Sequence, residues 1–314
     1  MSTSSFTSSN TAGRPSKLRR ELARHKWAYL MLAPVVLYFL IFHYVPMYGV
    51  VIAFKDYDPV AGVINSPWVG LEWFEEFFNS MYLQRLLVNT LMLNLYDLLF
   101  GFPAPIVLAL MLNELTSMRF RQWVQTLVYL PHFISVVMIA GMMVDFLARD
   151  GVITQILMQL GANGEPLLRD PAWFRTIYVA SEIWQAAGWG SIIYLASLAG
   201  INPTLYEAAR VDGANRWHQL VHITLPSMLP VIMMMLIVRL GQMMTVGFEK
   251  ILLLYNPSVY ETADVISTFV YRRGILDANY SFAAAVGLFN SVIAMVLLIV
   301  ANRISRRLTG NGLW

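Results

Sequence analysis

Six long apolar segments limit what this chain of 314 residues can fold into. A helix needs about 20 consecutive apolar residues to cross the roughly 30 Å hydrocarbon core of a membrane. Only 13% of the residues are charged, against about 25% in soluble domains, so the composition agrees. The sequence therefore predicts an all-α membrane protein with six transmembrane helices, at residues 27–54, 86–112, 123–144, 177–201, 229–248 and 282–301.

Basic residues gather at the two ends of the chain. Residues 1–26 begin with a Ser/Thr-rich stretch and then turn basic, which predicts a largely disordered tail beside the membrane. The segment 27–54 is too long for the core of a signal peptide, so we expect a retained anchor helix. Under the positive-inside rule the tail lies in the cytoplasm, and six spans return residues 305–314 to the same side.

The predicted organisation continues with an external loop at 55–85 and a core domain at 86–304. The external connections hold most of the acidic residues, Asp264 among them. The connection at 202–226 faces the cytoplasm and is polar and rich in turn residues, although apolar segments flank it.

A short helix is predicted at the start of this connection. Asn202 is a common helix N-cap, and Pro203 suits the first helical position. Gly213 is a common C-terminal stop, so the helix should cover 203–212. Apolar residues and a threonine at 217, 220, 221 and 224 then predict a second helix, which Pro226 should end before the fifth span.

Small residues form the crest of the resulting helix, turn, helix elbow. Ala208, Ala209, Gly213 and Ala214 allow another backbone to approach closely. From composition alone, the elbow is either a docking device or a well-capped loop at the membrane surface.

The motif in this elbow resembles that of a known family. "EAARVDGA" followed by "ITLPSMLP" is similar to the EAA loop of permeases of binding-protein-dependent ABC importers, the type I (MetI-like) family typified by the maltose permeases. The start, "HYVPMYGVVIAFKDYDP" with "WVGLEWFEEFF", resembles the subgroup that imports complex carbohydrates. The residues that match the loop pattern are Glu207, Ala208, Ala209, Asp212, Gly213, Ala214, Ile223, Leu225, Pro226 and Pro230.

The resemblance implies a MetI-like fold in the bacterial inner membrane and an oligosaccharide permease that couples to a cytoplasmic ATPase through residues 207–226. Glu207 would pair with a basic residue of the ATPase, and Gly213 would supply the bend. The implied partners are two copies of the ATPase, an extracytoplasmic solute-binding protein, a second permease that we expect to be a homologue, and membrane lipid. No nucleic acid is expected.

Hydrolysis is expected to occur on the partner. No lysine follows a glycine in this sequence, so the GK pair of a phosphate-binding loop is missing. ATP and Mg would therefore bind to the ATPase, and this chain would hold no cofactor. We also expect no catalytic residues and no metal site: His132 follows Pro131 at a predicted kink and is interpreted as a packing residue.

Ionisable residues inside the predicted spans are costly and usually face a cavity or a partner. Arg239 could pair with Glu182 or Glu249 to hold the bundle together, or it could contact substrate. The substrate reading adds Gln242, one turn further along the same helical face, and Asn290 in the last span.

The fourth span carries a second polar face. Glu182, Gln185 and Trp189 recur at i, i+3 and i+7, which puts hydrogen-bonding groups and an aromatic ring on one side. Sugars favour such mixed surfaces, although Trp189 could equally belong to an interfacial tryptophan belt. The candidate substrate-binding residues are therefore Glu182, Gln185, Trp189, Arg239, Gln242 and Asn290.

Two hypotheses about cargo and energy supply remain open. Arg239, Lys250, Arg272 and Arg273 could form a basic lining for an oligosaccharide that contains uronate, such as an alginate or pectin fragment, against a neutral oligosaccharide. The alternative to an ATP-driven importer is an ion-coupled secondary transporter, in which Asp97, Glu182 and Arg239 would relay charge.

Overall fold

The computed structural model describes residues 24–161, 164–243 and 247–309, so the Ser/Thr-rich start of the predicted tail lies outside the described residues. The chain divides into two compact units, residues 1–51 and 52–314. The helical run Lys26–Phe54 has a mean hydropathy of 2.0, which suits a membrane-spanning helix. Its parts are α2 (Lys26–Phe39), η1 (Leu40–Tyr44), α3 (Val45–Met47) and η2 (Tyr48–Phe54).

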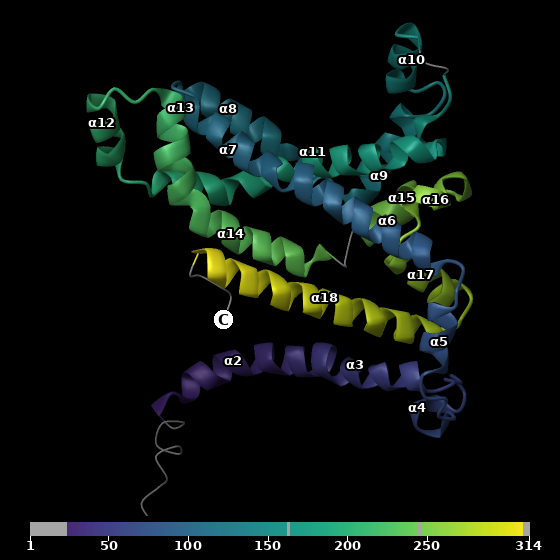
Figure 1. Cartoon of the computed structure of the whole chain (residues 1–314). Helices are drawn as coiled ribbons and strands as arrows, with labels where there is room; N and C mark the ends of the chain where they lie inside the picture. The colour runs from purple at the N-terminus through teal and green to yellow at the C-terminus, as the bar shows by residue number, and fades with distance from the viewer. Residues whose placement is uncertain (1–23, 162–163, 244–246, 310–314) are drawn as a thin grey trace, which may run out of the picture. The chain divides into compact units, whose positions relative to one another are not determined.

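The second unit is built from helices throughout its described part (Figure 1). Within this described part, β structure is limited to one isolated bridge between Lys55 and Trp68. The elements are α4 (Gly62–Asn65), α5 (Glu72–Phe78), α6 (Leu83–Tyr96), η3 (Asp97–Gly101), α7 (Pro103–Glu114), α8 (Met118–Tyr129), η4 (Leu130–Phe133), α9 (Val136–Phe146), α10 (Val152–Gln159), η5 (Leu167–Arg169), α11 (Pro171–Ala199), α12 (Pro203–Val211), α13 (Arg216–Gln219), η6 (Leu220–Thr224), α14 (Leu225–Gly241), α15 (Phe248–Leu254), η8 (Pro257–Val259), α16 (Tyr260–Ala263), α17 (Ile266–Tyr271), η9 (Arg272–Leu276) and α18 (Tyr280–Thr309).

The all-α prediction is confirmed, whereas the number of spans stays a prediction. Among the described residues, four helices are long and apolar enough to cross a membrane: Lys26–Phe54, Leu83–Glu114, Arg216–Gly241 and Tyr280–Arg303. The pair Met118–Phe133 and Val136–Phe146 makes a fifth if it is one span. Helix α11, the predicted fourth span, has 29 residues but carries Glu182 and Gln185 among its apolar residues, and it is not one of the five.

The predicted kink in the third span is confirmed and is large. The two helices of this pair meet at 97°, with Pro131 in the short 3-10 turn between them. Ser135 begins the second helix as an N-cap, because its side chain accepts a hydrogen bond from the Met138 amide at 3.3 Å.

Three prolines in the long helices follow a widened turn. Pro46, Pro103 and Pro226 each come two residues after a π-turn, at η1, η3 and η6. Proline lacks an amide hydrogen and its ring collides with the carbonyl four residues back, and the extra residue of a π-turn relieves both problems. The expectation that Pro226 ends the second elbow helix was therefore wrong: the helix runs from Arg216 to Gly241 without interruption.

Three apolar clusters hold the second unit together. One joins α6, α9, α11 and α15 around Phe174 and Ile251, and another joins α5, α6, α17 and α18 around Phe77 and Phe282. The third joins α7, α11 and α14 around Met228. Between membrane helices such side chains stabilise the fold through van der Waals packing, because lipid tails are as apolar as the side chains themselves.

The segment after the fifth helix is folded rather than an open external loop. Helix α14 ends at Gly241, earlier than the predicted 248, and α15 packs against α9. Lys250 and Asp264, both assigned to external connections by the sequence, are 2% and 0% exposed. The last helix is longer than predicted, since α18 continues to Thr309 and takes in half of the expected tail 305–314.

Candidate functional site

Helix α12 forms the first arm of the elbow and has capped ends. The side chain of Asn202 accepts a hydrogen bond from the Thr204 amide at 3.0 Å. At the other end, Gly213 has a φ of +79°, and the Ala214 amide donates to the carbonyl of Ala209 at 2.8 Å. A residue with positive φ after a helix is usually glycine, so the predicted stop has a clear physical cause.

The second arm is continuous with the fifth long helix. Asn215 caps α13, because its side chain accepts from the His218 amide at 2.9 Å. The helix then passes through η6 into α14. A force on the elbow therefore acts directly on a helix that reaches the middle of the second unit.

Two polar contacts hold the elbow in place, one within it and one to the rest of the protein. The hydroxyl groups of Tyr206, on α12, and Thr224, on η6, lie 3.0 Å apart, and Thr224 is buried. Arg216 and Glu114 lie 3.1 Å apart, but both are well exposed, so this ion pair is weak. The first contact ties the two arms together, and the second joins the elbow to the end of α7.

The predicted coupling residues divide into an outer and an inner set. Glu207, Ala208, Asp212, Gly213 and Pro226 are exposed, whereas Ala209, Ala214, Ile223 and Leu225 are half-buried. Three apolar side chains that the sequence reading did not assign are also exposed in this region: Val211 at 89%, Trp217 at 68% and Leu205 at 48%. A cavity of about 1100 Å³ lies between the elbow and the α7–α8 connection.

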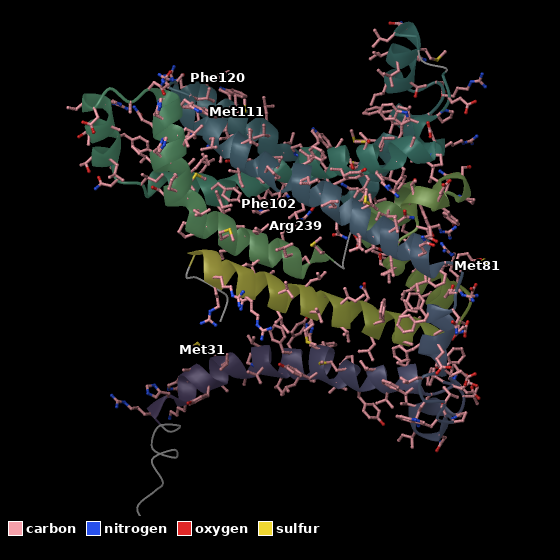
Figure 2. The ribbon with its side chains drawn as sticks, in the orientation of Figure 1. Met31, Met81, Phe102, Met111, Phe120 and Arg239 are labelled. Atoms are coloured by element: carbon pink, nitrogen blue, oxygen red, sulfur yellow. The ribbon has the colours of Figure 1, made fainter. Side chains whose placement is uncertain are left out.

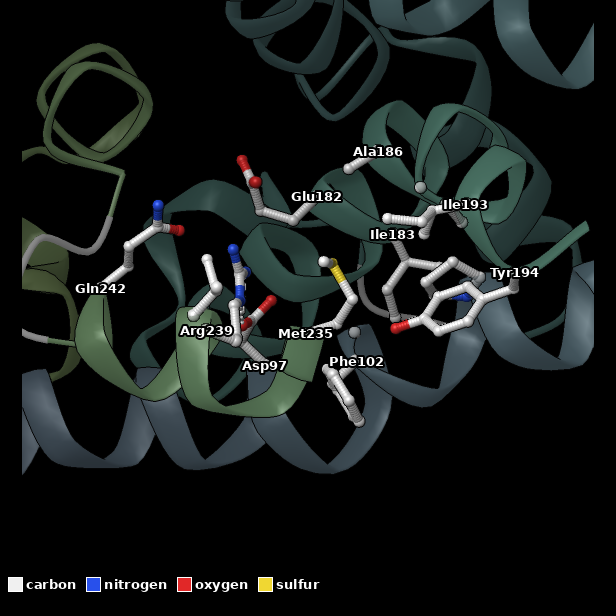
Figure 3. A pocket seen from close by; sticks show the side chains of 15 residues that line it. Asp97, Phe102, Glu182, Ile183, Ala186, Ile193, Tyr194, Met235, Arg239 and Gln242 are labelled. Atoms are coloured by element: carbon white, nitrogen blue, oxygen red, sulfur yellow. Dashed lines mark hydrogen bonds and ion pairs between the residues drawn. The ribbon is translucent and has the colours of Figure 1, made fainter. Parts of the chain in front are cut away.

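A second site lies where α7, α11 and α14 meet, and we call it the central cavity (Figure 3). It has a volume of about 270 Å³, and its lining includes Asp97, Glu182, Tyr194, Arg239 and Gln242. Figure 2 shows Arg239 and Phe102 near the middle of the second unit, with Met111 and Phe120 toward the end that carries α12 and α13.

Arg239 pairs with Asp97, not with Glu182 or Glu249 as expected. Its Nε donates to Asp97 Oδ2 at 2.7 Å, and a second guanidinium nitrogen forms an ion pair with the same carboxylate. Asp97 is the first residue of η3, and a Cβ added at Gly101 would collide with its carboxylate. Glycine at this position therefore leaves the room that Asp97 occupies.

Glu182 pairs instead with Lys250. Lys250 Nζ lies 2.5 Å from Glu182 Oε1 and donates to Gln185 Oε1 at 2.8 Å. Both α11 residues contact one ammonium group, so they share a helical face as the spacing predicted. The sequence analysis placed Lys250 in a basic lining but missed its pairing with Glu182 and Gln185, although its position within the apolar run "FEKILLL" was a signal that it is enclosed.

A larger cavity, of about 490 Å³, lies on the other side of Glu182, and we call it the His132 cavity. Its lining includes His132, Gln185, Glu249 and Lys250, and Glu182 and Ala186 line both cavities. The ring of Trp189 stacks on His132 with centroids 4.7 Å apart and an angle of 2°. Trp189 remains 46% exposed.

The structure groups five of the six candidate substrate residues and separates the sixth. Arg239, Gln242 and Glu182 line the central cavity, Gln185 lines the His132 cavity, and Trp189 contacts His132. Asn290 lines a different, mostly apolar cavity beside α17 and α18.

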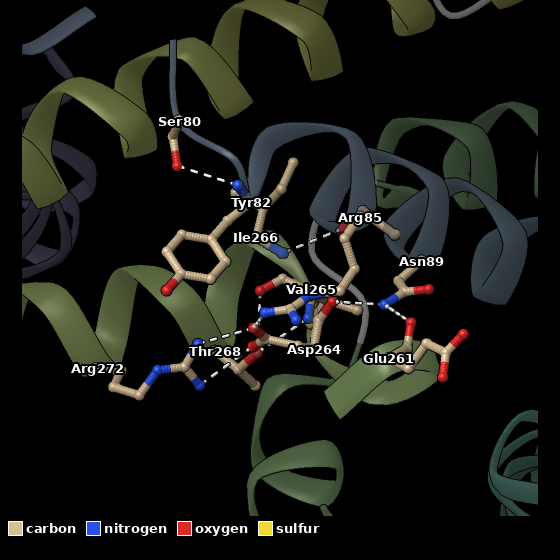
Figure 4. Close-up of polar contacts among 11 residues, drawn as sticks. Ser80, Tyr82, Arg85, Asn89, Glu261, Asp264, Val265, Ile266, Thr268 and Arg272 are labelled. Atoms are coloured by element: carbon tan, nitrogen blue, oxygen red, sulfur yellow. Dashed lines mark hydrogen bonds and ion pairs between the residues drawn. The ribbon is translucent and has the colours of Figure 1, made fainter. Parts of the chain in front are cut away.

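Asp264 is the centre of a buried polar cluster that sequence reasoning did not find (Figure 4). Its carboxylate lies 2.7 Å from Arg272 and 3.1 Å from Arg85, and it accepts from the Thr268 hydroxyl at 2.9 Å. Burial alone would lower the pKa of Arg272, but the hydrogen bonds and attraction to Asp264 outweigh it and raise that pKa. The cluster joins α6 to the segment between α14 and α18.

Each base of the expected basic lining has an acidic partner. Besides the pairs described above, Arg273 lies 3.3 Å from Asp277 and 3.9 Å from Glu76. The expected lining is therefore not an unpaired basic surface at Arg239, Lys250, Arg272 and Arg273. Among the described residues, no group of three or more His, Asp or Glu side chains could hold a metal ion.

Comparison with known proteins identifies the class of this fold. The family described as "Binding-protein-dependent transport system inner membrane component" matches residues 101–310. Protein LplB of Bacillus subtilis (strain 168) is 44% identical over 305 residues, which cover 97% of this chain and 96% of that protein. The polygalacturonan/rhamnogalacturonan transport system permease protein YteP of the same organism is 41% identical, over 95% of this chain and 93% of its own.

Two solved structures share the fold over nearly the whole chain. One is a bacterial ABC transporter involved in the import of the acidic polysaccharide alginate, with a TM-score of 0.88, 48% identity, and coverage of 94% of this chain and 100% of that one. The other shows the alginate transporter in complex with an alginate pentasaccharide-bound periplasmic protein, with a TM-score of 0.88, 47% identity, and coverage of 95% and 100%.

The chain belongs to the family of binding-protein-dependent inner-membrane transport components. It is a membrane-embedded permease subunit of an ABC importer and not an enzyme, and the resemblance carried by residues 207–230 is confirmed. The alternative of an ion-coupled secondary transporter is excluded by this membership.

Proposed function

We propose that this permease imports uronate-containing oligosaccharides and forms half of the translocation pathway. The observation that carries the proposal is the pair of cations, Arg239 and Lys250, held in the walls of two adjoining cavities between the long helices. The relatives whose names state an acidic cargo support it, since they are more than two-fifths identical over nearly the whole chain.

An ion-paired lining can still receive an anionic cargo. Arg239 and Lys250 each face one carboxylate, and the carboxylate of a uronate is the same chemical group as that of Asp97 or Glu182. Cargo can therefore bind by exchange with an internal acid. Within this proposal Glu182, Gln185, Trp189, Arg239 and Gln242 contact the sugar, whereas Asn290 lies in another cavity and is left out.

Uptake into proteoliposomes tests the cargo. The assembled importer is supplied with its binding protein, ATP and either trigalacturonate or its methyl ester, which has the same length and no charge. We expect the acid to be taken up at least about tenfold faster, equivalent to about 1.4 kcal/mol. Equal uptake of both, or uptake of the ester alone, contradicts the proposal.

The elbow is proposed as the ATPase-docking device. Its exposed acid Glu207, its glycine bend and the exposed side chains of Leu205 and Val211 form a compact polar and apolar surface of the kind that fits a groove on a partner. Because the second arm continues into α14, closure of two ATPases would rotate that helix and the cavities beside it. The energy for transport then comes from ATP bound on those partners.

The remaining partners follow from membership of the family. We propose a second, homologous permease, because the polar groups described here line one side of a pathway, and an external solute-binding protein, because the family is binding-protein-dependent. A complex with such a binding protein is known for the alginate importer. Co-purification from cells that express the neighbouring genes, followed by identification of each subunit, tests this composition.

The arrangement in the membrane is proposed to have six spans with both termini in the cytoplasm. Helix α11 would be the fourth span, since 29 residues at about 1.5 Å per residue reach across the bilayer. The chain has no cysteine, so single cysteines introduced at Asp150, Asp212 or Asp277 report their side of the membrane directly. Labelling of position 212 from outside intact cells contradicts this topology.

A further inference from the structure

The ion pair between Glu182 and Lys250 differs from the well-buried ion pairs of the Asp264 cluster. In the Asp264 cluster the acid is enclosed, with 0% of its side chain exposed, and the arginines reach the surface. In the α11–α15 pair the order is reversed: Lys250 is 2% exposed and Glu182 is 26% exposed. The cation therefore lies behind its acid, and the acid lines the cavities.

Glu182 also separates two spaces. It lines the central cavity and the His132 cavity, whereas Lys250 lines the latter alone. A group that arrives from the central cavity therefore meets the Glu182 carboxylate before it meets the ammonium group.

The cation is held in place without help from Glu182. Gln185 donates from Nε2 to the carbonyl of Ile134 at 3.3 Å, which turns its Oε1 toward Lys250. Lys250 itself lies on α15, and the next residue of this helix, Ile251, is fully buried in the first apolar cluster. A receptor that is fixed before its ligand arrives loses little entropy on binding.

A ring-binding surface lies beside this receptor. His132 lines the same cavity as Lys250 and stacks on Trp189, one helical turn beyond Gln185. A uronate presents an apolar ring face next to a carboxylate, so the ammonium group and the two rings match both parts of one sugar.

We infer that Lys250 is the receptor for a cargo carboxylate and that Glu182 occupies this receptor while no cargo is bound. Uronate binding displaces Glu182, which turns into the cavity water, and departure of the sugar returns it to Lys250. A buried ammonium group without a counter-ion is costly, so Glu182 keeps the empty pathway stable. This inference rests on the proposed acidic cargo.

Selectivity of uptake tests the inference. The ratio of trigalacturonate uptake to methyl ester uptake is measured for the assembled wild-type importer and for the variants. All of them use the same binding protein. The preference of that binding protein cancels when the ratio of each variant is divided by that of the wild type. Lys250→Met should lower the ratio about tenfold, and Glu182→Gln, which removes the competing acid, should raise it or leave it unchanged. Glu249→Gln is the matched control, because it removes an equal charge from the wall of the same cavity.

The outcomes separate this inference from the cargo proposal. If wild type prefers the acid and Lys250→Met keeps that preference, or if both variants lose uptake of both sugars equally, Lys250 and Glu182 form a structural contact and the inference is overturned alone. If wild type shows no preference for the acid, both proposals fail.

A second measurement does not depend on sugar. Ala186 lines both cavities, and Ala186→Cys creates the one thiol in a cysteine-free chain. The rate of its reaction with an anionic methanethiosulfonate, relative to a cationic one, should fall in Lys250→Met and rise in Glu182→Gln. An unchanged ratio in Lys250→Met, or a thiol that stays unlabelled in every nucleotide state, overturns the inference.

Discussion

Arg239 Nε donates a hydrogen bond to Asp97 Oδ2 at 2.7 Å, so the last turn of α14 is joined to the π-turn between α6 and α7. Asp97 is 14% exposed and Arg239 is 43% exposed, which places this ion pair at the edge of the central cavity. A movement of α14 that starts at the elbow therefore pulls on the helix that lines the opposite wall.

We predict that Arg239→Gln lowers stability by about 1–2 kcal/mol, because it leaves Asp97 without its cation. The value is below the 3–5 kcal/mol of a fully buried pair, since water screens the exposed part of Arg239. The double variant Asp97→Asn/Arg239→Gln should recover most of the loss. The apparent Tm of the detergent-solubilised importer measures both effects, and losses that simply add in the double variant would show that the two side chains are not coupled.

Glu207→Ala is expected to leave the permease inserted and folded but to weaken its retention of the ATPase by about tenfold or more. The reason is that the exposed carboxylate is proposed to form a charged contact across the docking surface. Retention is measured by co-purification at rising salt, with Glu72→Ala as the control because it removes an exposed acid far along the chain. Full retention and normal uptake in Glu207→Ala would remove this residue from the docking surface.

Pro226→Ala tests the role of the π-turn at η6. Alanine restores the amide hydrogen, so the turn can relax from π to α geometry and rotate the elbow by about 100° relative to α14. We expect ATPase activity to persist while sugar transported per ATP falls several-fold. Pro230→Ala is the matched control, since Pro230 lies further inside the same helix and follows no π-turn. Identical coupling in the two variants contradicts the prediction.

Asp264→Asn should be among the most destabilising substitutions of a charged residue in this chain, at about 3–5 kcal/mol. It leaves Arg85 and Arg272 together beside an uncharged amide in a buried site. Asp277→Asn, at an exposed carboxylate paired with Arg273, should cost less than about 1 kcal/mol. Thermal unfolding of both variants measures the difference, and equal Tm values would mean that the Asp264 cluster is not a stabilising element.

The elbow was predictable because its signals are local. Asn202, Pro203 and Gly213 each act through their own backbone geometry, so the sequence predicted α12 to within one residue. The kink at Pro131 belongs to the same class. Pro226 was misread because a π-turn is formed by the residues before a proline, and no residue type in "LVHIT" signals it.

The polar sites were only partly predictable, since partners are chosen by tertiary packing. The spacing of Glu182 and Gln185 correctly placed them on one face, but it gave no information about Lys250, 65 residues further along. Asp97 and Arg239 are 142 residues apart and meet because α7, α11 and α14 pack together. For Asp264 the charged composition of "YETADVISTFVYRR" suggested a water-facing loop, whereas the segment folds back and buries its acid.

Trp189 offers a direct test of the aromatic surface beside Lys250. If a sugar ring lies against this side chain, Trp189→Ala should raise the apparent KM for the oligosaccharide by roughly 2- to 10-fold, which corresponds to an aromatic contact of about 0.5–1.5 kcal/mol. Trp189→Phe keeps a ring that can stack on His132 and should lose less. Trp184 is the matched control, because it lies on the same helix at 45% exposure against 46% for Trp189. Trp184→Ala should leave the KM unchanged, since this tryptophan is expected to serve only as a membrane anchor. Equal effects of Trp184→Ala and Trp189→Ala on the KM would place both residues in an interfacial belt and remove Trp189 from the sugar pathway.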